Sequence, residues 1–224
     1  MSLTLAFDIY GTLVDTNGVV TLLKDMVGDR AEEFARRWRD KQLEYSFRRA
    51  LMRRYEPFAV CVSQSLEYVC ESMAIELTDE QMASLLQFFR KLPAFDDVEP
   101  TLKAMKEKDF RMYAFSNGKQ DAVEGLLKGA GIRDYLDGVI SVDDVQSFKP
   151  DPVVYQHFLK QAGSDADNTW LISGNPFDVV GAMSAGLKGA WVQRTPQAVF
   201  DPCDMEPDLI VSGLGDLVGA IGSR

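Results

Sequence analysis

Four short polar segments of the sequence carry the residue types that could do chemistry. They contain two carboxylates, one ammonium, several hydroxyls and two amides, so their charges are complementary. Taken one at a time, these residues have ordinary explanations: Asp8 as a turn former, Ser116 as a loop hydroxyl and Asn175 as a helix N-cap. The segments are Asp8-Ile9-Tyr10-Gly11-Thr12, Ser116-Asn117-Gly118, Lys149-Pro150 and Ser173-Gly174-Asn175-Pro176-Phe177-Asp178.

The chain has 224 residues and one histidine, His157. A single histidine excludes metal sites built from several histidines and relays of two histidines, and it disfavours most catalytic triads. Acid–base work must therefore fall mainly on Asp, Glu, Lys or Tyr. His157 itself is expected to be a surface or packing residue.

The formal net charge is -10. This acidic balance argues against a nucleic-acid partner, which needs a clustered basic excess, and against an anionic membrane surface. Residues 30–54 are the exception, because nine basic and four acidic side chains give that segment +5 and leave the rest of the chain at -15. Most of its arginines are expected on a solvated helix face, while one or two could reach inward to an anion.

The polar segments need strands to position them, and short apolar runs precede or separate them. Because helical stretches lie between the runs, the pattern predicts a parallel sheet covered on both faces. Ligands bind outside the carboxyl ends of the strands in such a sheet, so the polar segments should meet at one edge. The predicted strands are 3–7, 112–115, 139–140, 169–172, 190–192 and 209–211, and the predicted helices are near 99–108, 120–129, 152–162, 177–185 and 213–221.

Residues 17–92 contain no convincing strand and have apolar residues at helical spacing. Thr78 with Gln81 three residues later is typical of a capping box at a helix start. We therefore expect an all-helical domain over 17–92, inserted into a core made of 1–16 and 93–224. Asp151-Pro152 and Asn175-Pro176 each predict an N-cap followed by proline in the first helical turn.

The three cysteines, Cys61, Cys70 and Cys203, are widely spaced and odd in number, which favours reduced thiols in a reducing compartment. The first residues lack the basic and apolar regions of a signal peptide, and no apolar run reaches the length of a membrane span. These features favour a cytoplasmic location.

Taken together, the four segments resemble the haloacid dehalogenase superfamily. The resemblance is carried by D-I-Y-G-T-L at 8–13, S-N-G at 116–118, K-P at 149–150 and S-G-N-x-x-D at 173–178, in an order that spans nearly the whole chain. The helical insertion resembles that superfamily's cap domain. The implied fold class is α/β, with a Rossmann-like, doubly wound parallel sheet as core and an inserted all-helical cap domain.

Two departures from the phosphatases of the superfamily indicate a subgroup. Tyr10 stands where phosphatases have a second aspartate as general acid, and Gly174-Asn175 stands where they have part of an acidic magnesium motif. Both features, with W-R-D-K-Q-L-E-Y at 38–45 and S-F-K-P-D-P-x-x-Y at 147–155, resemble the L-2-haloacid dehalogenases. This subgroup releases halide from short-chain L-2-haloacids, yields 2-hydroxy acids, and needs neither metal nor other cofactor.

The resemblance implies a nucleophilic role for Asp8, which attacks the second carbon of a small haloalkanoate and forms an ester. A water oriented by Asp178, with help from Lys149, Asn175 or Thr12, then hydrolyses the ester, and Ser173 and Tyr155 support that network. The halide is assigned to Arg39 and Asn117. The substrate carboxylate is assigned to Ser116, Lys149 and the backbone N–H groups after Asp8, at Ile9 and Tyr10, and the apolar wall to Tyr10, Leu43, Phe58 and Phe177.

Some alternatives stay open at this point. Arg39 could be one more solvated arginine, and Tyr155 could be plain helix packing. The subgroup usually has glutamine at Asp40 and tryptophan at Phe177, so substrate range is open. A magnesium-dependent phosphatase of the same superfamily and a non-catalytic anion-binding module are the competing functions. The apolar helical stretch 45–73 could serve a homodimer, as the resemblance implies, or only pack against the core.

Overall fold

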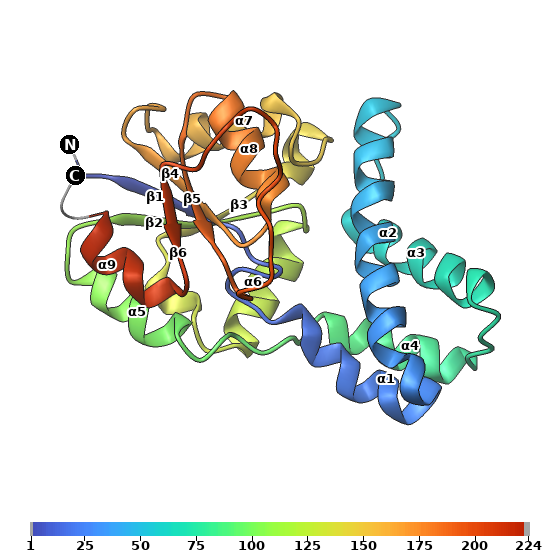
Figure 1. Cartoon of the computed structure of the whole chain (residues 1–224). Helices are drawn as coiled ribbons and strands as arrows, with labels where there is room; N and C mark the ends of the chain where they lie inside the picture. Colours follow the sequence, from blue (N-terminus) through green and yellow to red (C-terminus); the bar gives the residue numbers. More distant parts are fainter. Residues whose placement is uncertain (1, 222–224) are drawn as a thin grey trace.

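The fold is organised around a six-stranded parallel sheet, which the computed structural model describes together with the rest of residues 2–221. The strand order is β3-β2-β1-β4-β5-β6, with every neighbouring pair parallel (Figure 1). The strands are β1 (Thr4–Phe7), β2 (Arg111–Ser116), β3 (Gly138–Ser141), β4 (Thr169–Ser173), β5 (Lys188–Val192) and β6 (Leu209–Val211).

Helices cover both faces of this sheet, which is why its central strands are continuous apolar runs rather than alternating ones. In Figure 1, α5, α6 and α9 lie on one face and α7 and α8 on the other. The direction of winding changes between β1 and β4, which is the usual place for a ligand site in a doubly wound sheet. The helices are α5 (Val98–Lys106), α6 (Gln120–Gly129), α7 (Pro152–Ala162), α8 (Pro176–Ser184) and α9 (Leu217–Ala220).

Four further helices form a unit beside the sheet, and Figure 1 shows them grouped at its carboxyl edge. They pack on one another through apolar faces, and the buried indole of Trp38 donates a hydrogen bond of 3.0 Å from α2 to the carbonyl of Val62 in α3. The predicted capping box at Thr78 and Gln81 is confirmed at the start of α4. The helices are α1 (Val19–Val27), α2 (Ala31–Leu51), α3 (Phe58–Ser72) and α4 (Asp79–Phe89).

Two chain segments join the helical unit to the sheet, and they lie side by side. Val14 forms an antiparallel bridge with Ala94. The N–H of Asp15 donates to the carbonyl of Pro93 at 2.8 Å, and the N–H of Phe95 donates to the carbonyl of Leu13 at 3.1 Å. The two connections therefore form one short paired ribbon between the units.

The predicted strands and most predicted helices are confirmed, with two differences. The helix expected over 213–221 is only a 3-10 turn, η5 (Leu214–Asp216), followed by the four residues of α9, because three glycines weaken helix formation there. Asp151 caps α7 as expected by accepting a hydrogen bond from the N–H of Val153. Asn175 precedes α8 but makes no side-chain cap, because its amide bonds elsewhere.

The remaining 3-10 turns are η1 (Thr16–Gly18), η2 (Gly28–Arg30), η3 (Arg133–Tyr135) and η4 (Val142–Val145). All three cysteines are free thiols, with Cys61 buried and Cys203 exposed. Within residues 2–221, the helices lack the length and apolar character needed to cross a bilayer.

Close packing of α8 on its neighbours depends on Gly181. A Cβ atom at this position would lie 2.5 Å from Cβ of Pro150 and 2.5 Å from the hydroxyl oxygen of Tyr155. Both neighbours are stiff, because one is a proline ring and the other a buried aromatic side chain. The glycine therefore lets α8 approach the chain around Pro150 and Tyr155 more closely than any other residue would.

We predict that Gly181→Ala lowers the free energy of unfolding by about 1–3 kcal/mol, the usual cost of overpacking. The matched control is Gly125→Ala in α6, where an added Cβ meets nothing within 4 Å. That variant should raise stability by about 0.5–1 kcal/mol, because alanine loses less conformational entropy in a helix. Urea unfolding followed by circular dichroism measures both, and equal stability of the two variants would contradict the packing argument.

Candidate active site

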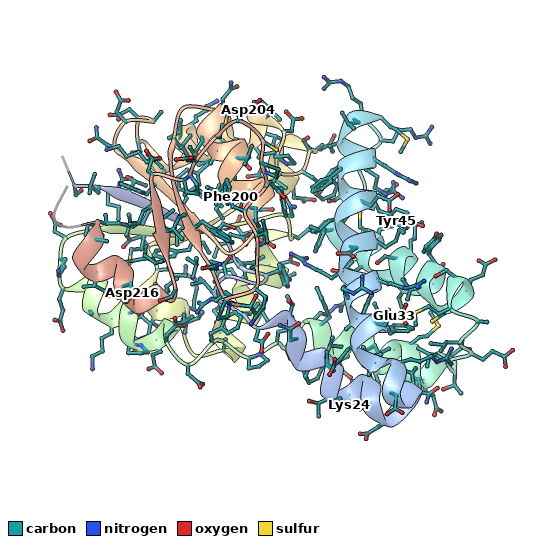
Figure 2. All side chains as sticks on the ribbon, viewed as in Figure 1. Lys24, Glu33, Tyr45, Phe200, Asp204 and Asp216 are labelled. Atoms are coloured by element: carbon teal, nitrogen blue, oxygen red, sulfur yellow. The ribbon has the colours of Figure 1, made fainter. Side chains whose placement is uncertain are left out.

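Asp8 lies directly after β1, at the carboxyl edge between β1 and β4, and its side chain is largely buried. The segments that follow β2 and β4 and the loop before α7 reach the same edge. In Figure 2, side chains of the helical unit and of the part of the chain that carries the sheet project toward each other between α2 and this edge. Residues from both units therefore border the site, as the contact of Arg39 with Asn175 shows.

The two oxygens of the Asp8 carboxylate have unequal surroundings. Oδ2 accepts hydrogen bonds from the hydroxyl of Thr12 at 2.7 Å, the amide Nδ2 of Asn175 at 2.8 Å and the hydroxyl of Ser173 at 3.3 Å. Among residues 2–221, Oδ1 accepts a single hydrogen bond, from Nζ of Lys149 at 3.1 Å. Oδ2 is thus held by three donors, whereas Oδ1 keeps lone pairs that can attack an electrophile.

Lys149 joins the two carboxylates of the site. Its side chain is 1% exposed, and Nζ lies 3.1 Å from Oδ1 of Asp8 and 2.7 Å from Oδ2 of Asp178. Nζ also donates to the carbonyl of Phe115 at 2.9 Å. Burial alone would lower the pKa of Lys149, but the charges of Asp178 and Asp8 outweigh it and raise the pKa above its ordinary value. Lys149 is therefore a permanent cation.

Asp178 is completely buried at the start of α8. Burial raises its pKa to about 6, although Lys149 and the hydroxyl of Tyr155 favour the ionised form. That hydroxyl donates to Oδ1 of Asp178 at 2.8 Å, so Tyr155 belongs to the network and is not plain helix packing. A carboxylate with this pKa can accept a proton near neutral pH.

The side chain of Arg39 extends from α2 into the site. It therefore points inward and does not lie on the solvated face of the helix. Its Nη2 lies 3.4 Å from Oδ1 of Asn175 and 3.5 Å from the carbonyl oxygen of Tyr10. Burial lowers the pKa of the guanidinium, while Asp8 and Tyr10 oppose that effect. Arg39 also lines a cavity of about 540 Å³ together with Trp38 and Phe89. An arginine stays protonated in proteins, so Arg39 brings a positive charge to the side of the site where Tyr10 and Asn175 lie.

Aromatic rings form one side of the site. The ring of Tyr10 stacks on Phe89 with centroids 5.3 Å apart and lies 6.0 Å from the ring of Phe58. Burial raises the pKa of Tyr10 to about 12, so its hydroxyl stays neutral. Phe177 packs against Phe47 of α2 at 5.1 Å. These rings supply an apolar wall made by both units.

The segment after β2 is buried and supports the Lys149 loop. The side-chain oxygen of Asn117 accepts a hydrogen bond from the backbone N–H of Lys149 at 3.0 Å. The hydroxyl oxygen of Ser116 accepts from the N–H of Gly118 at 3.1 Å and keeps its own hydrogen to donate. Both side chains therefore lie at the carboxyl edge of β2, next to the loop that carries Lys149.

The structure thus brings most of the predicted site residues together. Ile9 and Leu43 are outside the hydrogen-bonded network of side chains. One connected network contains Asp8, Thr12, Lys149, Tyr155, Ser173, Asn175 and Asp178. Ile9 is completely buried, so only its backbone can reach a ligand, and Leu43 lies half-buried on α2. His157 is a packing residue, and its Nε2 lies 3.3 Å from Asp144.

Residues around the site that sequence reasoning missed are Phe89, Asp97 and Arg194. Arg194 donates to the carbonyl of Thr12 at 3.2 and 2.5 Å and to both carboxylate oxygens of Asp97. It follows β5, whose carboxyl end lies at the same edge as the other polar segments. The signal for Arg194 in the sequence is its place directly after the predicted strand 190–192.

The charged side chains of the site also bear on whether its two carboxylates hold a metal ion. Lys149 already places one ammonium between Asp8 and Asp178, so the two carboxylates are balanced by a side chain of the protein itself. In the part of the chain that the structure describes, no three His, Cys, Asp or Glu side chains cluster in a way that could hold a metal ion. The arrangement suits a carboxylate nucleophile, a fixed cation and a buried base.

Comparison with known proteins agrees with this geometry. A model of the haloacid dehalogenase-like hydrolase family matches residues 3–186. The chain is 33% identical over 214 residues to a (S)-2-haloacid dehalogenase of Pseudomonas sp. (strain YL), covering 96% of this chain and 92% of that protein. It is 30% identical to haloacetate dehalogenase H-2 of Moraxella sp. (strain B), covering 97% of this chain and 96% of that protein.

Among solved structures, the chain is similar to an L-2-haloacid dehalogenase from Xanthobacter autotrophicus that has chloropropionic acid covalently bound. The TM-score is 0.93 and the identity 30%, with 100% of both chains covered. The family match and these full-length similarities show that the chain belongs to the haloacid dehalogenase-like hydrolases and, within them, to the L-2-haloacid dehalogenases.

Proposed function

We propose that this protein is a (S)-2-haloacid dehalogenase, a hydrolase that converts short-chain L-2-haloacids to 2-hydroxy acids and halide through an ester on Asp8. The observation that carries the proposal is the unequal environment of the two Asp8 oxygens. In the part of the chain that the structure describes, three donors hold Oδ2, whereas Lys149 alone donates to Oδ1. The reaction requires no metal, because Lys149 supplies the positive charge between the carboxylates.

In the first step, Oδ1 of Asp8 attacks the second carbon of the substrate. The new bond joins Oδ1 to that carbon, and the carbon–halogen bond breaks with its electron pair on the halide. Carboxylates are weak nucleophiles, so the rate depends on holding Asp8 ionised and in line with the leaving group. Lys149 keeps Asp8 ionised, and Thr12, Ser173 and Asn175 hold its carboxylate in line.

Two groups of donors receive the negative charges of the reactants. Arg39 and Asn117 bind the departing halide, which requires a positive, hydrogen-bonding surface. The substrate carboxylate is bound by the hydroxyl of Ser116, by Lys149 and by the backbone N–H groups of Ile9 and Tyr10. The rings of Tyr10, Phe58 and Phe177, with Leu43, line the side chain of the substrate.

In the second step, a water attacks the carbonyl carbon of the Asp8 ester. Asp178 takes one proton from that water, and the negative charge develops on Oδ2. Thr12, Ser173 and Asn175 already donate to Oδ2, so they stabilise this charge as an oxyanion hole. Collapse then breaks the bond between Oδ1 and the ester carbon, so Oδ1 leaves with the 2-hydroxy acid, which takes the proton held by Asp178. The carboxyl group left on Asp8 contains the oxygen of the water and releases the second proton of that water to solvent, which regenerates the carboxylate.

The helical unit serves as a cap in this proposal. Residues 17–92 form the cap domain and residues 1–16 and 93–224 the catalytic core. The support is that Arg39, Phe58 and Phe89 come from the helical unit and contact Tyr10 or Asn175 of the core. Closing the cap on the core would therefore complete the halide and substrate surfaces.

The location and assembly of the protein are also part of the proposal. The three cysteines are free thiols, which is typical of proteins in the reducing cytoplasm, and this supports a cytoplasmic location. The end of α2 exposes Leu51 and Met52, and α3 exposes Tyr68, which supports a homodimer formed through these helices. The other partners are a small haloalkanoate, as substrate, and halide, as product.

We predict that Asp8→Asn reduces halide release from L-2-chloropropionate by at least about 10⁴-fold, because an amide cannot serve as the nucleophile. The wild-type enzyme should release halide equally well with EDTA present, and ion chromatography measures both. Asp167→Asn is the matched control, since Asp167 is exposed, and it should keep full activity.

Phosphate release from p-nitrophenyl phosphate, stopped by EDTA, would instead support the magnesium-dependent phosphatase. Wild-type protein that releases no halide from any short-chain 2-haloacid would overturn the proposal.

A second prediction concerns pH. The rate of ester hydrolysis at saturating substrate should fall as pH drops through a midpoint at or below about 6, because Asp178 acts as base only when ionised. Tyr155→Phe removes a hydrogen bond that favours ionised Asp178, so the midpoint should move to higher pH by about one pH unit. The pH profile of kcat measures this.

Tyr135→Phe is the control for the loss of a hydroxyl, because the hydroxyl of Tyr135 donates to Glu99 in an exposed contact away from the site. Its profile should match that of the wild-type enzyme. An unchanged midpoint in Tyr155→Phe would refute the assignment of Asp178 as the base.

A further inference from the structure

We propose that Arg194 is a positioning residue for the second step of the reaction, acting through Thr12. Its Nε and Nη2 both donate to the carbonyl oxygen of Thr12, at 3.2 and 2.5 Å. The hydroxyl of the same threonine donates to Oδ2 of Asp8 at 2.7 Å and accepts from the N–H of Gly174 at 2.8 Å. Fixing the backbone of Thr12 therefore fixes a donor to the nucleophile.

Arg194 is itself held firmly. Nη1 donates to both carboxylate oxygens of Asp97, at 2.8 and 2.7 Å, and the guanidinium lies 4.1 Å from the centre of the Phe95 ring. Asp97 also accepts a hydrogen bond from the N–H of Leu214 at 2.7 Å. The Arg194 side chain is 14% exposed, so this ion pair is partly shielded from solvent. Arg194 with Asp97 and Phe95 thus forms a clamp, which can hold the backbone carbonyl of Thr12 in place.

The clamp sits where both connections to the helical unit meet the sheet. Thr12 precedes the first connection, Phe95 belongs to the second, and Asp97 follows it. The two connections pair at Val14 and Ala94. Arg194 therefore ties the start of one connection to the end of the other, and it holds the segment that carries Thr12 in place while the helical unit contacts the site.

This role deepens the proposed function and rests on it. During ester formation Asp8 keeps its other partners, Lys149, Ser173 and Asn175. During ester hydrolysis the negative charge develops on Oδ2, and the stabilisation depends steeply on how well each donor is placed. Loss of Arg194 should therefore slow hydrolysis of the ester far more than its formation.

Rapid-quench single turnovers of L-2-chloropropionate separate the two steps, with halide release reporting ester formation and mass spectrometry of the protein reporting the ester. In Arg194→Met the ester should decay about tenfold more slowly, a fraction of the effect of deleting an oxyanion donor, and accumulate. The first turnover of halide should stay within about threefold of wild type. Arg194→Lys keeps the charge but not the forked geometry, and its decay rate should lie between the two.

Arg111→Met controls for destabilisation, because Arg111 also donates to backbone carbonyls, those of Ala162 and Gly163, away from the site. It should leave both rates unchanged. A double-mutant cycle with Thr12→Val tests the path of the effect: with no hydroxyl at position 12, Arg194→Met should cause little further slowing of ester decay.

Equal slowing of both steps in Arg194→Met, unchanged decay of the ester, or effects that multiply with those of Thr12→Val would each overturn the inference. None of these outcomes touches the proposed function, which fails only if the wild-type protein itself releases no halide or forms no ester.

Discussion

The rest of the site depends on one buried ammonium between two buried carboxylates. Without Lys149, the charges of Asp8 and Asp178 would repel each other in a medium that screens poorly, and one carboxylate would take up a proton. The charge of Lys149 lowers the pKa of Asp178, but it does not fully offset the effect of burial, which raises that pKa to about 6. This incomplete balance is useful: a fully stabilised carboxylate would be too weak a base, and an unpaired one would be neutral at physiological pH.

The topology of the sheet is what makes this triplet possible. Asp8 follows β1 and Asp178 opens α8 after β4, so the pairing of β1 with β4 brings the two carboxylates to one place. Lys149 comes from the loop before α7, on the face that α8 also covers. Gly181 then permits the close contact of α8 with Tyr155, which delivers a hydroxyl to Asp178. The two carboxylates, the ammonium and the Tyr155 hydroxyl are therefore positioned by packing within the sheet unit.

Much of this arrangement can be predicted from the sequence, because parallel strands place all of their carboxyl ends at one edge. That rule alone is enough to gather Asp8, Ser116 and Asp178 in one region. It does not say which donor faces which oxygen, since that depends on strand order and side-chain rotamers. Asn175 shows the difference: its sequence position predicts an N-cap, whereas its amide donates to Asp8. The place of Arg194 after β5 identifies it as a neighbour of the site, but its contact with Thr12 is hard to predict because the acceptor is a backbone carbonyl, which no residue type reveals.

The division of labour between the two units explains why a protein of net charge -10 can act on an anion. The sheet unit neutralises its own carboxylates with Lys149 and has little positive charge to spare for a leaving group. In the proposed mechanism Arg39 supplies that charge from α2, within the segment of charge +5, and its contacts with Tyr10 and Asn175 are long, at 3.5 and 3.4 Å. A guanidinium so weakly paired keeps most of its donors for an anion. The helical unit thus adds a positive charge that the sheet unit lacks, and the paired connections at Val14 and Ala94 join the two units.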